Sequence, residues 1–174
     1  MIRTLTSISH AQMIHSAIHW PEMSDHKLWP MAVMHSMFLV NHVPSLSTGM
    51  APIDLFSKSR WEQRKLNDLH VWGAPSYTLT KALSDGKKIP RWQARSTRHM
   101  HVGLSTGHVG MTPLVLNPET GSITAQHQVV FDDWFATVSS AESDMPDFGS
   151  DEWKQLFGPD SIFSCDFDND NGQD

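Results

Sequence analysis

The stretch Pro113-Leu114-Val115-Leu116-Asn117-Pro118-Glu119-Thr120-Gly121-Ser122-Ile123-Thr124 carries the clearest fold signal in the chain. Two short β-prone runs flank five residues that include the turn formers Asn117, Pro118 and Gly121. This pattern predicts a β-hairpin with a bulged five-residue loop. We therefore expect an antiparallel sheet in this part of the chain.

Further short runs extend the expected sheet on both sides of this hairpin. They cover 70–73, 76–79, 100–104 and 128–131, and a Gly-Ala-Pro bend separates the first two. About five short strands in roughly 65 residues are typical of a small antiparallel barrel.

The first 60 residues have helical rather than strand-like spacing. Apolar side chains recur every three to four residues over 2–19, and Pro21 ends the pattern. A second helix is expected to begin after Ser24 or Asp25, with Pro30 near its first turn, and a short third helix over 52–56. Two such helices cannot bury both apolar faces alone, so a sheet or further helices should cover them.

The net charge of −6 over 174 residues conceals three different blocks. Residues 1–59 are neutral, residues 60–101 carry a net charge of +6, and residues 132–174 carry −11. The last block also loses its periodicity while keeping several aromatic residues. This composition predicts a mostly disordered acidic tail with a short helix near 151–157.

The basic block contains the strongest candidate for a binding site. Residues 87–98 place five cations around one indole within twelve residues. Cations of this kind neutralise phosphates, and an aromatic side chain can stack on an exposed base. The alternative is a solvated loop whose cations keep the chain soluble or pair with the acidic tail. The candidate nucleic-acid-binding residues are Lys87, Lys88, Arg91, Trp92, Arg95 and Arg98.

No catalytic or metal-binding constellation is expected. The lone cysteine, Cys165, excludes an internal disulfide, and no Gly-x-Ser-x-Gly or phosphate-binding glycine loop is present. His15 and His19 share a helix face and His99 and His101 alternate on a predicted strand, but surface or core roles are favoured over ligation. We expect no cofactor, no small-molecule substrate and no membrane span, and a cytoplasmic or nuclear location.

The order of several motifs resembles one protein family, the copia-type retrotransposon polyproteins, over about residues 1–138. Three motifs resemble the last helices of the integrase core: His19-Trp20-Pro21-Glu22, Leu28-Trp29-Pro30-Met31-Ala32-Val33 and Asn41-His42-Val43-Pro44. Thr48-Gly49-Met50-Ala51-Pro52-Ile53-Asp54-Leu55-Phe56 is similar to the segment that leaves this core. The entry and later strands of an SH3-like barrel are matched by Leu69-His70-Val71-Trp72-Gly73-Ala74-Pro75, by Arg95-Ser96-Thr97-Arg98 through Ser105, and by 113–133.

This resemblance implies an α+β fold in three parts. Residues 1–59 would be helices left from a ribonuclease-H-like integrase core, 66–135 a small SH3-like β-barrel, and 136–174 an acidic tail. His99 stands where the family usually has glycine, so a strained turn is expected if the position needs a positive φ.

The family's activity is DNA integration, in which two aspartates and a glutamate hold Mg²⁺ or Mn²⁺. In the family these carboxylates lie upstream of the stretch that resembles 2–5, and they have no counterpart in this sequence. We therefore expect a fragment without enzymatic activity that contacts DNA or RNA through its basic block. The alternatives are an interaction remnant, in which the chain associates with integrase or itself, and a non-functional pseudogene product.

Overall fold

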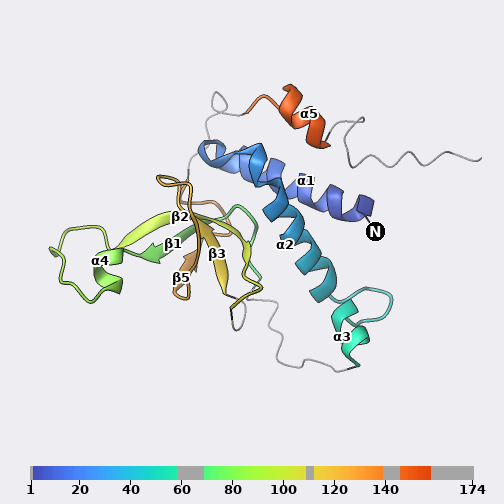
Figure 1. The fold of residues 1–174 in the computed structure, drawn as a ribbon, viewed down its shortest axis with the longest axis horizontal. Coiled ribbons are helices and arrows are strands. Elements are labelled where there is room, and N and C mark those ends of the chain that lie inside the picture. Colours follow the sequence, from blue (N-terminus) through green and yellow to red (C-terminus); the bar gives the residue numbers. More distant parts are fainter. Residues whose placement is uncertain (1, 59–68, 109–111, 139–145, 158–174) are drawn as a thin grey trace, which may run out of the picture.

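The computed structural model describes residues 2–58, 69–108, 112–138 and 146–157 and has the predicted α+β composition (Figure 1). The helices predicted over 2–19, 52–56 and 151–157 and the hairpin over 113–124 are confirmed. In chain order the elements are α1 (Ile2–His19), the 3₁₀ turns η1 (Pro21–Met23) and η2 (His26–Leu28), α2 (Trp29–His42), α3 (Pro52–Ser57), β1 (Pro75–Leu79), α4 (Lys81–Ser84), β2 (Ser96–Leu104), β3 (Pro113–Leu116), β4 (Ile123–Ala125), β5 (Val129–Phe131) and α5 (Asp151–Phe157).

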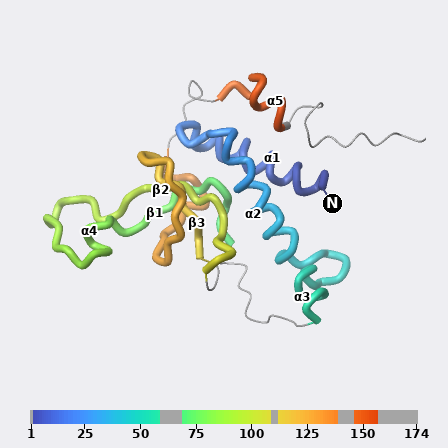
Figure 2. Tube along the Cα trace, viewed as in Figure 1, coloured from blue at the N-terminus to red at the C-terminus, as the bar shows by residue number. Residues whose placement is uncertain are grey.

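The helices α1 and α2 pack side by side (Figure 2). Small residues line their contact, and Ala17 and Ala32 are completely buried. The hydroxyl oxygens of Ser9 and Ser36 lie 2.9 Å apart in the interface and form a buried hydrogen bond. The Asp25 carboxylate accepts from the backbone N–H of Lys27 at 2.9 Å, so the predicted cap begins η2 rather than α2 itself.

The five strands form one antiparallel sheet in the order β4-β3-β2-β1-β5. The central strand β2 places Met100 opposite Pro75 of β1 and opposite Leu116 of β3. A shift in register between His101 and Gly103 marks a β-bulge, where Gly103 has a φ of 130°. Glycine tolerates this backbone conformation because it lacks a Cβ atom.

The expected closed barrel is wrong, because the described strands form an open sheet whose edges are β4 and β5. Each edge strand has only three residues. Strands this short offer few backbone groups for the additional pairing that would close a barrel.

A common hydrophobic core joins the helices to the sheet, which supplies the layer that the helical pattern requires. Met13 and Trp20 from the helical side meet Trp72, Met100 and Val102 from the sheet side, and all five are at most 3% exposed. Burial of side chains this large stabilises a fold by roughly 1.5–3 kcal/mol each. The two parts of the chain are therefore held together by the same packed interior.

The acidic segment contributes to this core through α5. Trp153 is 6% exposed and belongs to the same cluster as Met13 and Trp72, and Phe148 packs edge-on against it at a ring separation of 5.0 Å. Of the predicted tail 136–174, residues 139–145 and 158–174, with Cys165, lie outside the described residues. Residue 59 and residues 66–68 at the expected boundaries also lie outside them.

The structure corrects one local expectation and removes the condition of another. Residues 70–73 do not form a strand: a turn lies at Trp72 and Gly73, where Gly73 has a φ of 84° and the backbone N–H of Ala74 donates to the Val71 carbonyl at 3.2 Å. His99 lies in β2 opposite Ser76 and is not among the described residues with positive φ, so the condition under which strain was expected is not met at this position.

Within the described part of the chain, no helix has the length and apolar character needed to cross a membrane.

Candidate nucleic-acid interface

The predicted binding residues lie mainly on one excursion between the neighbouring strands β1 and β2. The strands end their pairing with Leu79 opposite Ser96, and the backbone N–H of Thr80 donates to the Arg95 carbonyl at 2.9 Å. Residues 80–95 therefore leave the sheet and return to it at one point. Figure 1 shows that this segment, which includes α4, projects from the end of the sheet away from α1 and α2.

Local hydrogen bonds shape the excursion. The single turn of α4 begins where the Thr80 carbonyl accepts from Leu83 at 2.9 Å, and it ends at Ser84, two residues before Gly86. Gly86 has a φ of 75°, and Lys87 donates back to the Ala82 carbonyl at 2.8 Å. A left-handed glycine with this return bond is a common helix end, and it starts the loop that we call the basic loop, residues 85–95.

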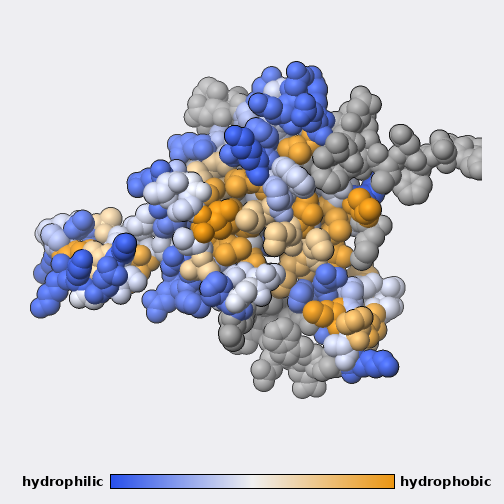
Figure 3. Space-filling model, in the orientation of Figure 1, coloured by the Kyte–Doolittle hydropathy of each residue, from blue (hydrophilic) through white to orange (hydrophobic). Residues whose placement is uncertain are grey.

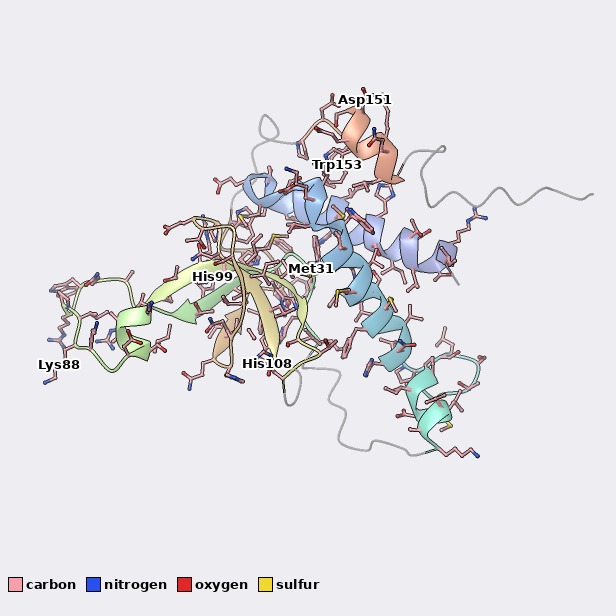
Figure 4. All side chains as sticks on the ribbon, in the orientation of Figure 1. Met31, Lys88, His99, His108, Asp151 and Trp153 are labelled. Atoms are coloured by element: carbon pink, nitrogen blue, oxygen red, sulfur yellow. The ribbon has the colours of Figure 1, made fainter. Side chains whose placement is uncertain are left out.

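Four of the six candidate residues are exposed cations on the basic loop: Lys87, Lys88, Arg91 and Arg95. Their fellow candidate Trp92 is 95% exposed, and the tip turns back where Gln93 donates to the Pro90 carbonyl at 3.1 Å. In Figure 4 the labelled Lys88 extends outward from the far end of the loop. The structure thus brings five predicted residues together on one protruding segment.

The charge of this loop is not neutralised by the described part of the protein. None of the ion pairs among the described residues involves any of the four cations, and the only carboxylate in the loop is Asp85. Exposed cations separated by less than a Debye length, about 8–10 Å in physiological salt, present a joint positive potential. A polyanion that follows the loop can therefore contact several of them.

Arg98, the sixth candidate, is placed apart from the basic loop. It lies within β2 opposite Tyr77, its guanidinium is 3.7 Å from the Glu22 carboxylate, and it covers the Trp20 ring at 5.2 Å. A cation over an indole face is attracted by the ring quadrupole. The contacts assign Arg98 to the junction between η1 and the sheet.

Replacing Arg98 therefore affects stability more than binding. Arg98→Gln should lower the free energy of unfolding by about 1 kcal/mol, because the ion pair is exposed and the cation–π contact is single. Affinity for nucleic acid should change less than about twofold, since one peripheral phosphate contact at most is lost. Urea unfolding and a DNA titration of the same variant measure both quantities, and a large loss of affinity at unchanged stability would contradict the placement.

One further cation near the interface, Lys81, is not among the candidate residues that the sequence indicated. Lys81 is exposed at the start of α4, one residue after the point where the excursion leaves the sheet. It stands six residues before the dense cluster in the sequence, and a four-residue helix gives no periodic signal. Only the return bond from Thr80 to Arg95 reveals that Lys81 lies at the base of the same excursion.

His15, His19, His70 and Asp133 make structural contacts within the described part of the fold. The rings of His15 and His19 lie 4.5 Å apart and both pack on Phe135. Asp133 accepts from Val71 N–H at 2.8 Å, and its second oxygen lies 2.9 Å from His70 Nδ1, which joins the start of the sheet segment to its end. Among the described residues, no group of three or more His, Cys, Asp or Glu could hold a metal ion.

A buried pair of histidines connects α2 to β2. His35 and His101 are almost fully buried, and their rings meet edge to face at 5.9 Å. Burial lowers the pKa of His35 to about 4. Burial, together with the nearby His35 and His70, lowers the pKa of His101 to about 3. Both rings are therefore neutral at physiological pH, and they belong to the packing between helix and sheet.

No protein-family model, no curated protein and no solved structure matches the chain.

Proposed function

We propose that this chain binds nucleic acid through the basic loop, by contacts to the phosphate backbone and without base-sequence specificity. The observation that carries this proposal is the joint exposure of Lys87, Lys88, Arg91 and Arg95 on one projecting loop, with no ion-pair partner among the described residues. Phosphate contacts of this kind position a protein on a strand but carry no sequence information. The chain has no role as an enzyme in this proposal.

The motif series in residues 1–138 supports DNA as the relevant polyanion. We propose that α1 and α2 correspond to the end of a ribonuclease-H-like integrase core and that the five strands correspond to its SH3-like domain in copia-type polyproteins. The antiparallel sheet supports this correspondence, and the open edges at β4 and β5 are its main departure from a closed SH3-like domain. In that family the SH3-like domain is implied to contact DNA or neighbouring subunits.

The test is a binding titration with a labelled mixed-sequence DNA at low salt. A variant with Lys87→Gln, Lys88→Gln, Arg91→Gln and Arg95→Gln should bind more than about tenfold more weakly than the natural chain. The slope of log affinity against log salt should also become shallower, by about 0.9 for each phosphate contact that is lost.

A matched variant separates the local effect from the change in net charge. Arg3→Gln, Lys27→Gln, Lys58→Gln and Lys154→Gln remove the same number of exposed cations from outside the basic loop. This control should bind within about twofold of the natural chain, because its cations lie away from the phosphate track. Equal affinities for the loop variant and the natural chain would refute the proposed function.

Self-association through α2 is a second candidate function. Met34 and Met37 are each 48% exposed on one face of this helix, and Figure 3 shows apolar surface over the middle of the molecule. Exposed apolar surface on a helix is a feature of protein interaction sites. Light scattering distinguishes the two candidates. A monomeric mass across the working concentration range excludes self-association. A dimeric mass that becomes monomeric in the Met34→Lys variant supports it.

A further inference from the structure

The tip of the basic loop carries an indole that is almost fully exposed in the described part of the structure. Trp92 is 95% exposed, whereas Trp20, Trp72 and Trp153 are in the core. Leu83 and Ile89 of the same excursion are half-buried, in contrast to Trp92. The indole face is therefore free to receive a ligand.

The charge around this indole indicates which ligand it suits. Arg91 precedes it directly, and Lys87, Lys88 and Arg95 belong to the same loop. Trp134 provides a contrast in the same molecule: it is 90% exposed but follows Asp132 and Asp133. Both indoles are exposed, but of the two only Trp92 lies on a loop that carries four exposed cations, which attract an anionic ligand with a flat ring.

We propose that the basic loop prefers single-stranded to double-stranded nucleic acid, because Trp92 stacks on an unpaired base while the neighbouring cations contact phosphates. This inference rests on the proposed function and adds its substrate class. Every base has a π-face, so stacking tolerates any sequence. In a duplex, neighbouring base pairs cover these faces, and only the phosphate contacts remain for the loop to use.

The proposal predicts a selective effect of Trp92→Ala. Affinity for a 20-nucleotide mixed-sequence single strand should fall by about 5- to 100-fold, the effect of losing one stacked base. Affinity for the duplex of the same sequence should change less than about twofold, since the phosphate contacts are unaffected. Trp92→Phe should recover much of the single-strand affinity, because it retains an aromatic face.

The experiment titrates each probe against the natural chain, Trp92→Ala, Trp92→Phe and the control Trp134→Ala. The single strand is used both as DNA and as RNA, and a selective loss with either supports stacking and identifies the strand chemistry. Trp134→Ala should leave all affinities unchanged. Unfolding midpoints of the variants are compared first, and no shift is expected because Trp92 is almost fully exposed.

Two outcomes overturn the inference and leave the proposed function intact. Equal losses for single strand and duplex would mean that Trp92 supports the loop rather than reading an unpaired base. Unchanged affinity for both, while the four-cation loop variant still binds poorly, would mean that the indole makes no contact. If the four-cation variant binds as well as the natural chain, the proposed function itself fails, which is a distinct result.

Discussion

Lowering the pH from 7 to 5 should reduce the free energy of unfolding by about 4 kcal/mol, because two buried histidines remain neutral only in the folded chain. Folded His35 and His101 have pKa values lowered to about 4 and about 3, against 6.5 for an ordinary histidine. Urea unfolding followed by tryptophan fluorescence at each pH measures the difference.

The sign follows from the proton balance of the two states. Between pH 6.5 and the lowered pKa values, the unfolded chain binds a proton at each ring and the folded chain does not. Stability is therefore lost as the pH falls through 6.5. At pH 5 each ring lowers the free energy of unfolding by about 2 kcal/mol, since pH 5 lies about 1.5 units below the unfolded pKa. Burial also lowers the pKa of His10 and His15, which adds smaller effects of the same sign.

Histidine variants show whether these rings cause the effect. His35→Gln should remove about half of the pH dependence, whatever it does to stability at pH 7, because one of the two buried rings no longer titrates. The exposed His127 provides the control, and His127→Gln should leave the pH dependence unchanged. Equal stability of the natural chain at pH 7 and pH 5 would contradict the burial of the pair between α2 and β2.

The second large effect concerns the contact between α1 and the turn before β1. Gly73→Ala should lower the free energy of unfolding by about 3 kcal/mol, from backbone strain and overpacking together. Gly73 has a φ of 84°, and a Cβ atom at this position would overlap the buried side chain of Ser16. Equilibrium unfolding in urea measures the loss.

Two companion variants separate the strain from the overlap. Gly121 has a similar φ of 67° but open space around it, so Gly121→Ala should lose only about 1 kcal/mol. Ser16→Gly combined with Gly73→Ala should be more stable than the sum of the single effects predicts, because the first change removes the overlapping side chain. Strict additivity of the two changes would show that α1 does not pack against this turn.

Much of the secondary structure could be predicted because its signals are local. The hairpin at 113–124 depends on turn formers within one loop, and α1 depends on the apolar spacing within one helix. Whether the sheet closes depends instead on pairing between β4, which forms a hairpin with β3, and β5, which pairs with the distant β1, and composition does not determine this. The Gly-Ala-Pro bend was expected, but the absence of a strand over 70–73 was not, because the bond from Gly73 to the His101 carbonyl joins residues 28 positions apart in the sequence.

The candidate site divides in the same way. The exposure of Lys87, Lys88 and Trp92 follows from a polar loop between strands, which sequence can indicate. The separation of Arg98 depends on Trp20 and Glu22, which tertiary packing brings to β2 from far away in the chain. Cations that are close together in the sequence therefore lie in two different environments: four on the exposed basic loop, and Arg98 against Trp20 and Glu22.

The most direct test of nucleic-acid binding by the basic loop is a titration of the isotope-labelled chain with single-stranded DNA, followed by amide and indole N–H signals in NMR spectra. We expect the largest shifts at the Trp92 indole and at the backbone amides of 85–95, with the Trp134 indole unchanged. Shifts that are absent from this loop, or that concentrate on α1 and α2, would contradict the account.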